Sequence, residues 1–182
     1  KKISFKFNGK NYYGYEGDTL ASALIANGVH LVGRSFKYHR PRGFFGAGVD
    51  EPYAIVQLYR NGETEPNVKA TEQELFDGLE ATSVNCWPNV NFDIGAINNF
   101  LNIFLPAGFY YKTFMWPKSF WFKIYEPFIR KAAGLGVAST KHDKERYEHK
   151  YEYCDLLITG SGPSGLASAY AAAKNGARVI LA

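Results

Sequence analysis

A glycine-rich segment late in the sequence has the spacing of a phosphate-binding turn. The run Gly160-Ser161-Gly162-Pro163-Ser164-Gly165 places its three glycines as G-x-G-x-x-G. The first glycine permits a sharp turn, the second leaves room for a pyrophosphate against the backbone, and the third lets a helix pack closely on a strand. The free amides and the positive dipole end of that helix would face the phosphates. These six residues are therefore the candidate cofactor-binding site.

The flanking residues supply the elements that such a turn requires. Cys154–Thr159 is a short apolar stretch that predicts a strand, Leu166–Asn175 is rich in Ala and Leu and favours a helix, and Arg178–Ala182 begins a second strand. A motif that is weak alone gains weight in this context. The sequence predicts the first βαβ unit of an α/β Rossmann dinucleotide-binding domain over residues 151–182. A glycine-rich turn without a ligand is the alternative.

One criterion of the dinucleotide fingerprint is not met. An acidic residue about 20 residues after the turn normally accepts hydrogen bonds from the ribose, and the sequence stops at Ala182. We therefore expect a truncated Rossmann start, which by itself binds dinucleotide poorly or not at all.

The N-terminal residues predict a different domain. Ile3–Phe7 alternates between apolar and polar residues, as a half-buried strand does, and Asn8-Gly9 favours a tight hairpin to a return strand over Asn11–Tyr15. Asp18 is the expected N-cap of a helix that ends before Gly28. A hairpin followed by a helix is typical of a β-grasp domain, so the predicted fold class is α+β.

The middle of the sequence gives weaker signals. Tyr53–Tyr59 predicts a third strand that ends in a hairpin at Arg60-Asn61-Gly62, and Glu72–Phe76 suggests one helical turn. Lys141–Lys150 is a charged run typical of an exposed linker. We expect a β-grasp domain over residues 1–95, an aromatic-rich connector and charged linker over 96–150, and the truncated dinucleotide-binding start over 151–182.

Outside the glycine-rich turn, no residue pattern predicts catalysis or a metal site. The histidines and cysteines lack the spacing of a metal site or a catalytic triad; they are His30, His39, His142, His149, Cys86 and Cys154. Cys86 is interpreted as a core residue. The basic loop Arg34–Arg42 has two interpretations. It is either a solvated face or subunit contact, or a clamp for phosphate or carboxylate groups.

Composition excludes several classes of protein. The 182 residues are 46% hydrophobic and 21% charged with a net charge of +4, which predicts a globular chain and argues against a nucleic-acid binder. No secretory signal follows Lys1-Lys2, and the unpaired cysteines favour a cytoplasmic protein. The apolar stretch Phe100–Phe128 is interrupted by prolines and lysines, so it does not predict a membrane span. It is either a partner surface or a surface that packs on the chain's own dinucleotide domain.

Four segments carry a resemblance to a known family. The sequences of Arg34–Gly43, Asn85–Pro88, Phe104–Pro117 and Tyr125–Gly136 resemble the N-terminal part of the alpha subunit of heterotetrameric sarcosine oxidase. The resemblance extends over essentially all 182 residues, and the aromatic segment is its most specific part.

The resemblance implies a fold, cofactors and partners. It implies a ferredoxin-like β-grasp domain, in which Gly43–Tyr53 lacks the cysteines that hold a two-iron, two-sulfur cluster in related dehydrogenases, so no cluster is expected. It implies NAD at Gly160–Gly165, FAD and FMN in the full assembly, and beta, gamma and delta subunits as partners. The assembly demethylates sarcosine to glycine, and sarcosine and tetrahydrofolate are handled outside this chain. The alternatives are the alpha subunit of an opine or hydroxyproline dehydrogenase, and a non-catalytic assembly module.

Overall fold

The computed structural model describes residues 1–60, 62–108, 115–134, 136–142 and 146–182. Contacts between residues divide the chain into two units, Lys1–Lys141 and His142–Ala182. The three-part division at residues 95 and 150 stays a prediction. Residues 109–114 of the aromatic segment and 143–145 of the charged linker lie outside the described residues.

The predicted N-terminal hairpin is confirmed. Strands β1 (Lys2–Phe7) and β2 (Lys10–Tyr15) pair antiparallel, and Asn8 and Gly9 both take positive φ angles at the turn, 50° and 76°. Alternate residues of β1 are buried, as the period of two predicts. The hairpin therefore presents one apolar face to the rest of the unit.

The helix after the hairpin begins one residue later than predicted. In α1 (Leu20–Ala26) the N-cap is Thr19, whose hydroxyl accepts from the amide of Ser22 while the Ser22 hydroxyl accepts from the amide of Thr19. The prediction of Asp18 as N-cap was wrong, because its carboxylate accepts from the amide of Tyr15 and the hydroxyl of Ser22. Gly28, with φ of 74°, follows the helix end as predicted.

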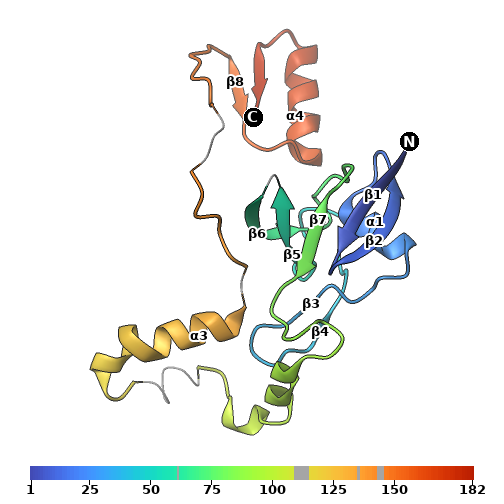
Figure 1. Cartoon of the computed structure of the whole chain (residues 1–182). Coiled ribbons are helices and arrows are strands. Elements are labelled where there is room, and N and C mark those ends of the chain that lie inside the picture. The colour runs from blue at the N-terminus through green and yellow to red at the C-terminus, as the bar shows by residue number, and fades with distance from the viewer. Residues whose placement is uncertain (61, 109–114, 135, 143–145) are drawn as a thin grey trace. The chain divides into compact units, whose positions relative to one another are not determined.

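A five-stranded mixed sheet forms the centre of the first unit (Figure 1). Its order is β2-β1-β7-β5-β6. The hairpin predicted at residues 60–62 joins β5 (Ile55–Arg60) to β6 (Glu63–Lys69), and β7 (Glu80–Ser83) lies between β1 and β5, parallel to β1 and antiparallel to β5. The predicted α+β class is confirmed for this unit.

One expectation for the middle of the chain was wrong, and one strand there was not predicted. Glu72–Phe76 forms turns and an isolated bridge in place of a helical turn, because Leu20 donates its amide to Gln73 and Leu75 donates to Asp18. Strand β7 was not predicted at all. Both segments are held by partners more than 20 residues away in sequence, which local patterns do not record.

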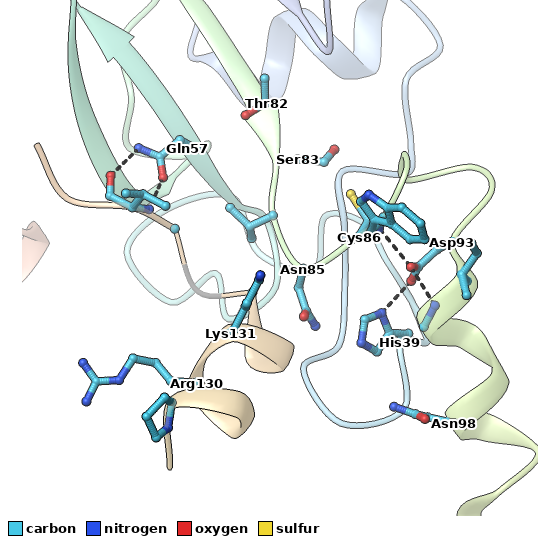
Figure 2. A pocket seen from close by; sticks show the side chains of 18 of the residues that line it. His39, Gln57, Thr82, Ser83, Asn85, Cys86, Asp93, Asn98, Arg130 and Lys131 are labelled. Carbon is cyan, nitrogen blue, oxygen red and sulfur yellow. Dashed lines mark hydrogen bonds and ion pairs between the residues drawn. The ribbon is translucent and has the colours of Figure 1, made fainter. Parts of the chain in front are cut away.

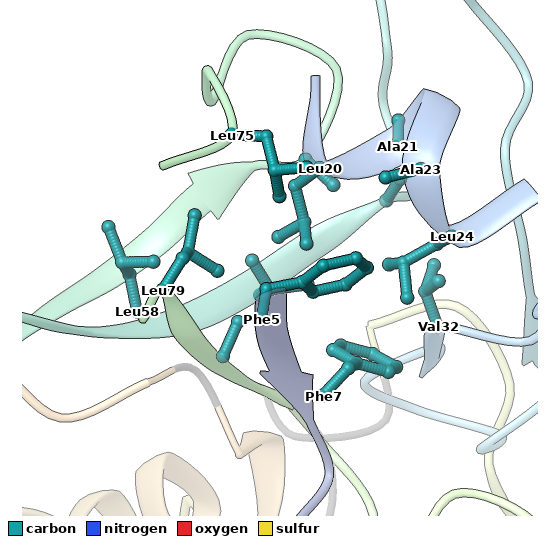
Figure 3. Close-up of a cluster of buried hydrophobic side chains, with 14 of the residues drawn as sticks. Phe5, Phe7, Leu20, Ala21, Ala23, Leu24, Val32, Leu58, Leu75 and Leu79 are labelled. Atoms are coloured by element: carbon teal, nitrogen blue, oxygen red, sulfur yellow. The ribbon is translucent and has the colours of Figure 1, made fainter. Parts of the chain in front are cut away.

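The core of the first unit lies between the sheet and α1 (Figure 3). Leu20 and Leu24 of α1 face Phe5 and Phe7 of β1, and all four side chains are at most 1% exposed. Each such burial stabilises the fold by about 1.5–3 kcal/mol. The remaining members of the cluster include Ile3, Ala23, Val32, Val56, Leu58, Leu75 and Leu79.

The first unit also contains short elements outside the five-stranded sheet. They are β3 (Gly33–Arg34), β4 (Pro41–Arg42), η1 (Ile94–Asn99), η2 (Asn102–Phe104), η3 (Lys118–Phe120), η4 (Trp121–Tyr125) and α3 (Glu126–Ala133). Many described aromatic side chains of this segment are exposed within the chain, including Phe100, Trp116 and Phe122. Whether a partner or the chain's own dinucleotide domain covers them stays a prediction.

The second unit has the predicted order of elements. Strand β8 (Leu156–Ile158) is followed by α4 (Pro163–Lys174) and by β9 (Val179–Leu181), and the two strands pair in parallel. Two strands and one helix are too few to identify a dinucleotide-binding fold, so the Rossmann assignment stays a prediction. No described helix is long and apolar enough to cross a membrane.

Candidate functional site

The glycine-rich turn lies at the junction between β8 and α4, where the motif requires it. Gly160 takes a φ of 102°, which other residues rarely adopt, and donates its amide to the carbonyl of Ala182 at the end of β9. Residues 160–164 are exposed within the chain. The structure therefore brings the six predicted site residues together as one turn.

The three glycines differ in what the fold requires of them: two are constrained by the fold and one is not. A Cβ on Gly165 would lie 2.0 Å from the carbonyl oxygen of Gly160, so only glycine lets α4 approach the turn this closely. Gly160 is required by its φ angle. A Cβ on Gly162 would meet nothing within 4 Å, and its φ of −67° suits any residue. Nothing within the chain thus explains a glycine at position 162, and its open side is where a ligand would approach.

The start of α4 offers donors to an anion. Gly162 is the N-cap and Pro163 follows it within the first turn, but no side chain caps this helix end. The first amides of a helix lack carbonyl partners within it, and the helix dipole adds positive charge there. Ser164 adds a hydroxyl at the same end. The geometry suits a phosphate, and the binding of a cofactor here stays a prediction.

A second candidate is a cavity of about 1010 Å³ in the first unit (Figure 2). One side holds a buried pair in which Nδ1 of His39 lies 2.6 Å from Oδ2 of Asp93. The other oxygen of Asp93 accepts from the amides of Trp87 and Gly95 at 3.0 and 3.1 Å. Sequence analysis missed this pair because 54 residues separate its members. The carboxylate holds the loop together, since its partners among the described residues are two backbone amides and the ring of His39.

Two further residues line this cavity: Asn85, whose backbone is strained, and Cys86, whose thiol is unreactive. Asn85 has a φ of 57°, donates its side-chain amide to the carbonyl of Arg34, and leaves its buried Oδ1 without a hydrogen-bond partner. Burial, together with the charge of Asp93, raises the pKa of the Cys86 thiol. A thiol with a raised pKa forms little thiolate and is a poor nucleophile. The cavity therefore contains no activated nucleophile among the described residues.

The basic loop is partly structural. The guanidinium of Arg34 donates to the carbonyls of Val90, His39 and Asn91, which ties β3 to the loop after β7. Lys37 donates to the carbonyl of Pro106. Arg34 and Lys37 thus donate to backbone carbonyls and Arg40 donates to the side chain of Asn99, and the choice between the two interpretations of this loop stays a prediction.

A buried carboxylate organises the loop before β5. Glu51 is 1% exposed, and its oxygens accept from four backbone amides, those of Phe45, Gly46, Tyr53 and Ala54, at 2.6–3.1 Å. Burial alone would raise the pKa of Glu51, but the four amides outweigh it and hold the pKa below its usual value. Sequence analysis found no role for this residue, because a glutamate in a glycine-rich loop carries no motif.

The N-terminal unit matches a family of iron–sulfur domains. Residues 1–86 match the family described as "2Fe-2S iron-sulfur cluster binding domain". A plant-type cluster requires four cysteine thiolates. The sequence contains only Cys86 and Cys154, and only the first lies within the match. Among the described residues, no group of three or more His, Cys, Asp and Glu could hold a metal ion. The donor set does not fit the cluster, and no electron-transfer step is assigned to it.

Comparison with known proteins extends the match to the whole chain. "Sarcosine oxidase subunit alpha" from Rhizobium meliloti (strain 1021) is 61% identical over 179 residues, which cover 98% of this chain and 18% of the relative. The protein of the same name from Corynebacterium sp. (strain U-96) is 29% identical over 98% of the chain and 14% of its own length. The chain thus spans less than a fifth of these relatives.

The chain also matches solved structures, among them that of an L-proline dehydrogenase. L-proline dehydrogenase from P. horikoshii shares 20% identity with this chain, and the match covers 100% of this chain and 24% of the dehydrogenase chain. The TM-score is 0.46, which is too low to support an argument. The Rhizobium relative, by contrast, is 61% identical to nearly all of this chain, in agreement with the resemblance seen in the sequence. Along 98% of its length, this chain is similar to a segment of the sarcosine oxidase alpha subunits.

Proposed function

We propose that this chain forms the N-terminal part of the alpha subunit of a sarcosine oxidase. The observation that supports the proposal is the 61% identity to such a subunit over 98% of the chain. The reaction proposed for the whole protein is the oxidative demethylation of sarcosine to glycine. Cys86 has a raised pKa and the His39–Asp93 pair is bound to the surrounding loop backbone, so the reacting groups are proposed to lie elsewhere in the assembly.

The role proposed for this segment is to supply the pyrophosphate turn of an NAD site. Gly162 is the residue that supports it, because the fold itself places no restriction on a side chain at that position. A methyl group there would project into the space above the first amides of α4. A pyrophosphate bound at those amides requires the same space. The ribose anchor is proposed to follow Ala182 in the longer protein.

Further cofactors and partners follow from the family. FAD and FMN are proposed to serve the amine oxidation in the full assembly, which contains beta, gamma and delta subunits and uses tetrahydrofolate. The proposed location is the cytoplasm. The exposed aromatic residues of the connector are proposed to face one of these partners or the remainder of the subunit.

The test uses the intact assembly with the full-length subunit, purified as wild type, Gly162→Ala and Gly48→Ala. Gly48 is the matched control, because a Cβ there meets only one side-chain atom at 3.9 Å and no positive φ is required. Overpacking of about 1–3 kcal/mol against the pyrophosphate corresponds to a loss of NAD affinity of roughly 5- to 150-fold. Calorimetric titration with NAD measures it. Equal NAD affinity in the wild type and Gly162→Ala would overturn the proposed site.

Substrate assays separate the proposed function from its alternatives. Wild-type assembly should oxidise sarcosine in preference to hydroxyproline and opines, with formaldehyde or methylene-tetrahydrofolate as the one-carbon product. Preferential oxidation of an opine or hydroxyproline would instead assign the chain to that dehydrogenase class. An assembly that oxidises none of these amines would indicate a non-catalytic module.

A further inference from the structure

The loop from residue 43 to residue 54 folds around one internal anion. Four backbone amides converge on the carboxylate of Glu51, two on each oxygen. By comparison, Asp18 and Asp77 each accept from a single backbone amide, those of Tyr15 and Ser4. Glu51 therefore accepts from four backbone amides where each of these carboxylates accepts from one, and Glu51 is also far more buried.

The N–H groups of backbone amides, which carry partial positive charge, stabilise this carboxylate. In the described part of the chain, no Lys, Arg or His lies within ion-pair distance of Glu51. A buried charge without such compensation is strongly unfavourable, whereas hydrogen bonds to an ionised acceptor are about twice as strong as neutral ones. The loop thus forms a cradle of amides whose conformation depends on a negative charge inside it.

Cradles of this kind bind anions in many proteins, iron–sulfur clusters included. Residues 1–86 match a cluster-binding family, yet they contain one cysteine where a cluster needs four. We propose that the carboxylate of Glu51 replaces the iron–sulfur cluster as the anion around which residues 43–54 fold. The N-terminal domain then keeps its loop without metal, and it serves as a structural domain that transfers no electrons.

Other contacts of the loop agree with a built-in organiser. The carbonyl of Gly48 accepts from the Thr71 hydroxyl at 2.9 Å, and the carbonyl of Val49 accepts from the Lys69 ammonium. These contacts attach the loop to the end of β6 from outside, while Glu51 holds it from inside. An organiser that belongs to the chain also needs no loading step during folding.

The test measures hydrogen exchange at single amides in the intact assembly. Its variants are Glu51→Gln, which keeps the shape but has one acceptor oxygen and directs an NH₂ group at two amides, and Glu51→Ala, which empties the cradle. Glu72→Gln is the matched control, since Glu72 is exposed. Loss of a charge-assisted hydrogen bond should speed exchange at residues 45, 46, 53 and 54 by about 10- to 100-fold in both Glu51 variants. Unchanged exchange at these amides would overturn the proposal.

Anion rescue distinguishes a charge requirement from a loss of packing. Formate should restore protection of the four amides in Glu51→Ala, whereas neutral formamide should not, and neither should affect the wild type. Rescue by formamide equal to that by formate would overturn the requirement for an anion.

A metal measurement tests the replacement directly and does not depend on the variants folding. Wild-type assembly is incubated anaerobically with ferrous iron and sulfide, desalted, and analysed for iron and acid-labile sulfide. The expected result is no stoichiometric iron in the alpha subunit. Two irons and two sulfides retained per subunit, with exchange at residues 43–54 altered by their binding, would overturn the proposal.

Discussion

Substituting Gly165 with alanine tests whether α4 owes its close approach to a missing side chain. The added Cβ would lie 2.0 Å from the carbonyl oxygen of Gly160 and 3.4 Å from Cγ2 of Ile158. Contacts of Cβ below 3.0 Å essentially do not occur, and the neighbour here is backbone that cannot rotate away. The start of α4 must therefore move from the turn by about 1 Å, which is a rearrangement of the turn itself.

Two opposing effects determine how much Gly165→Ala changes the free energy of opening of the second unit. Overpacking costs about 1–3 kcal/mol, and a contact this short with backbone belongs at the upper end. Alanine in a helix gains up to about 1 kcal/mol over glycine. The steric effect wins, and the net loss of about 2 kcal/mol corresponds to a roughly 30-fold increase in the population of the opened second unit.

Hydrogen exchange of the intact assembly provides the assay. Peptides covering β8, α4 and β9 should exchange roughly 30-fold faster in Gly165→Ala, because helix and strands can no longer pack as they do in the wild type. Gly162→Ala is the matched control and should leave this exchange unchanged, since its Cβ meets nothing within 4 Å. Wild-type exchange in Gly165→Ala would refute the inference that this glycine is required for packing.

Three more outcomes follow from buried groups of the first unit. Leu24→Ala should destabilise the core by about 2–5 kcal/mol, measured as opening free energy by hydrogen exchange, while Ile25→Ala, on the exposed side of α1, should cost well under half as much. Asp93→Asn should cost roughly 1–3 kcal/mol, measured by the same exchange over residues 85–95, because a neutral amide replaces the charge-assisted hydrogen bonds to His39 and to the amides of Trp87 and Gly95 with weaker ones; exposed Asp50→Asn should cost little. Burial alone would raise the pKa of Glu51, but its four amides hold this pKa below the usual value. The stabilisation that the ionised Glu51 gives should therefore be complete above the usual glutamate pKa of about 4.3 and disappear only as the pH falls below that value. Hydrogen exchange at residues 43–54, measured across this pH range, checks this dependence.

Much of the fold was predictable where local contacts decide it. The alternation in Ile3–Phe7 and the Asn8-Gly9 turn specify a hairpin whose partners are adjacent in sequence. Strand β7 was missed because it is four residues long and obtains its hydrogen bonds from β1 and β5, which lie far away in sequence. The N-cap was misplaced by one residue because Asp18 and Thr19 are both good capping residues. The Asp18 carboxylate accepts from Tyr15 and Ser22, which leaves Thr19 to cap the helix.

The candidate site divides in the same way. The turn Gly160–Gly165 was predictable because strand, turn and helix are consecutive, and because Gly160 and Gly165 each meet a local constraint. The pair of His39 and Asp93 was not, since the fold brings together residues from two loops. Glu51 was also missed, because its partners are backbone amides, which every residue has. No side-chain pattern can reveal such a cradle.

The two buried carboxylates of the first unit are both bound to the loops around them. Glu51 is held by four amides, and Asp93 by two amides and His39. A general base must be free to accept a proton at the working pH, and stabilisation of the ionised form makes Glu51 a weaker base. Each carboxylate thus stabilises a loop through the charge that catalysis would need to change. The cofactor site that we propose for this chain is accordingly the turn at Gly162 in the second unit, whose open side carries no such internal partner.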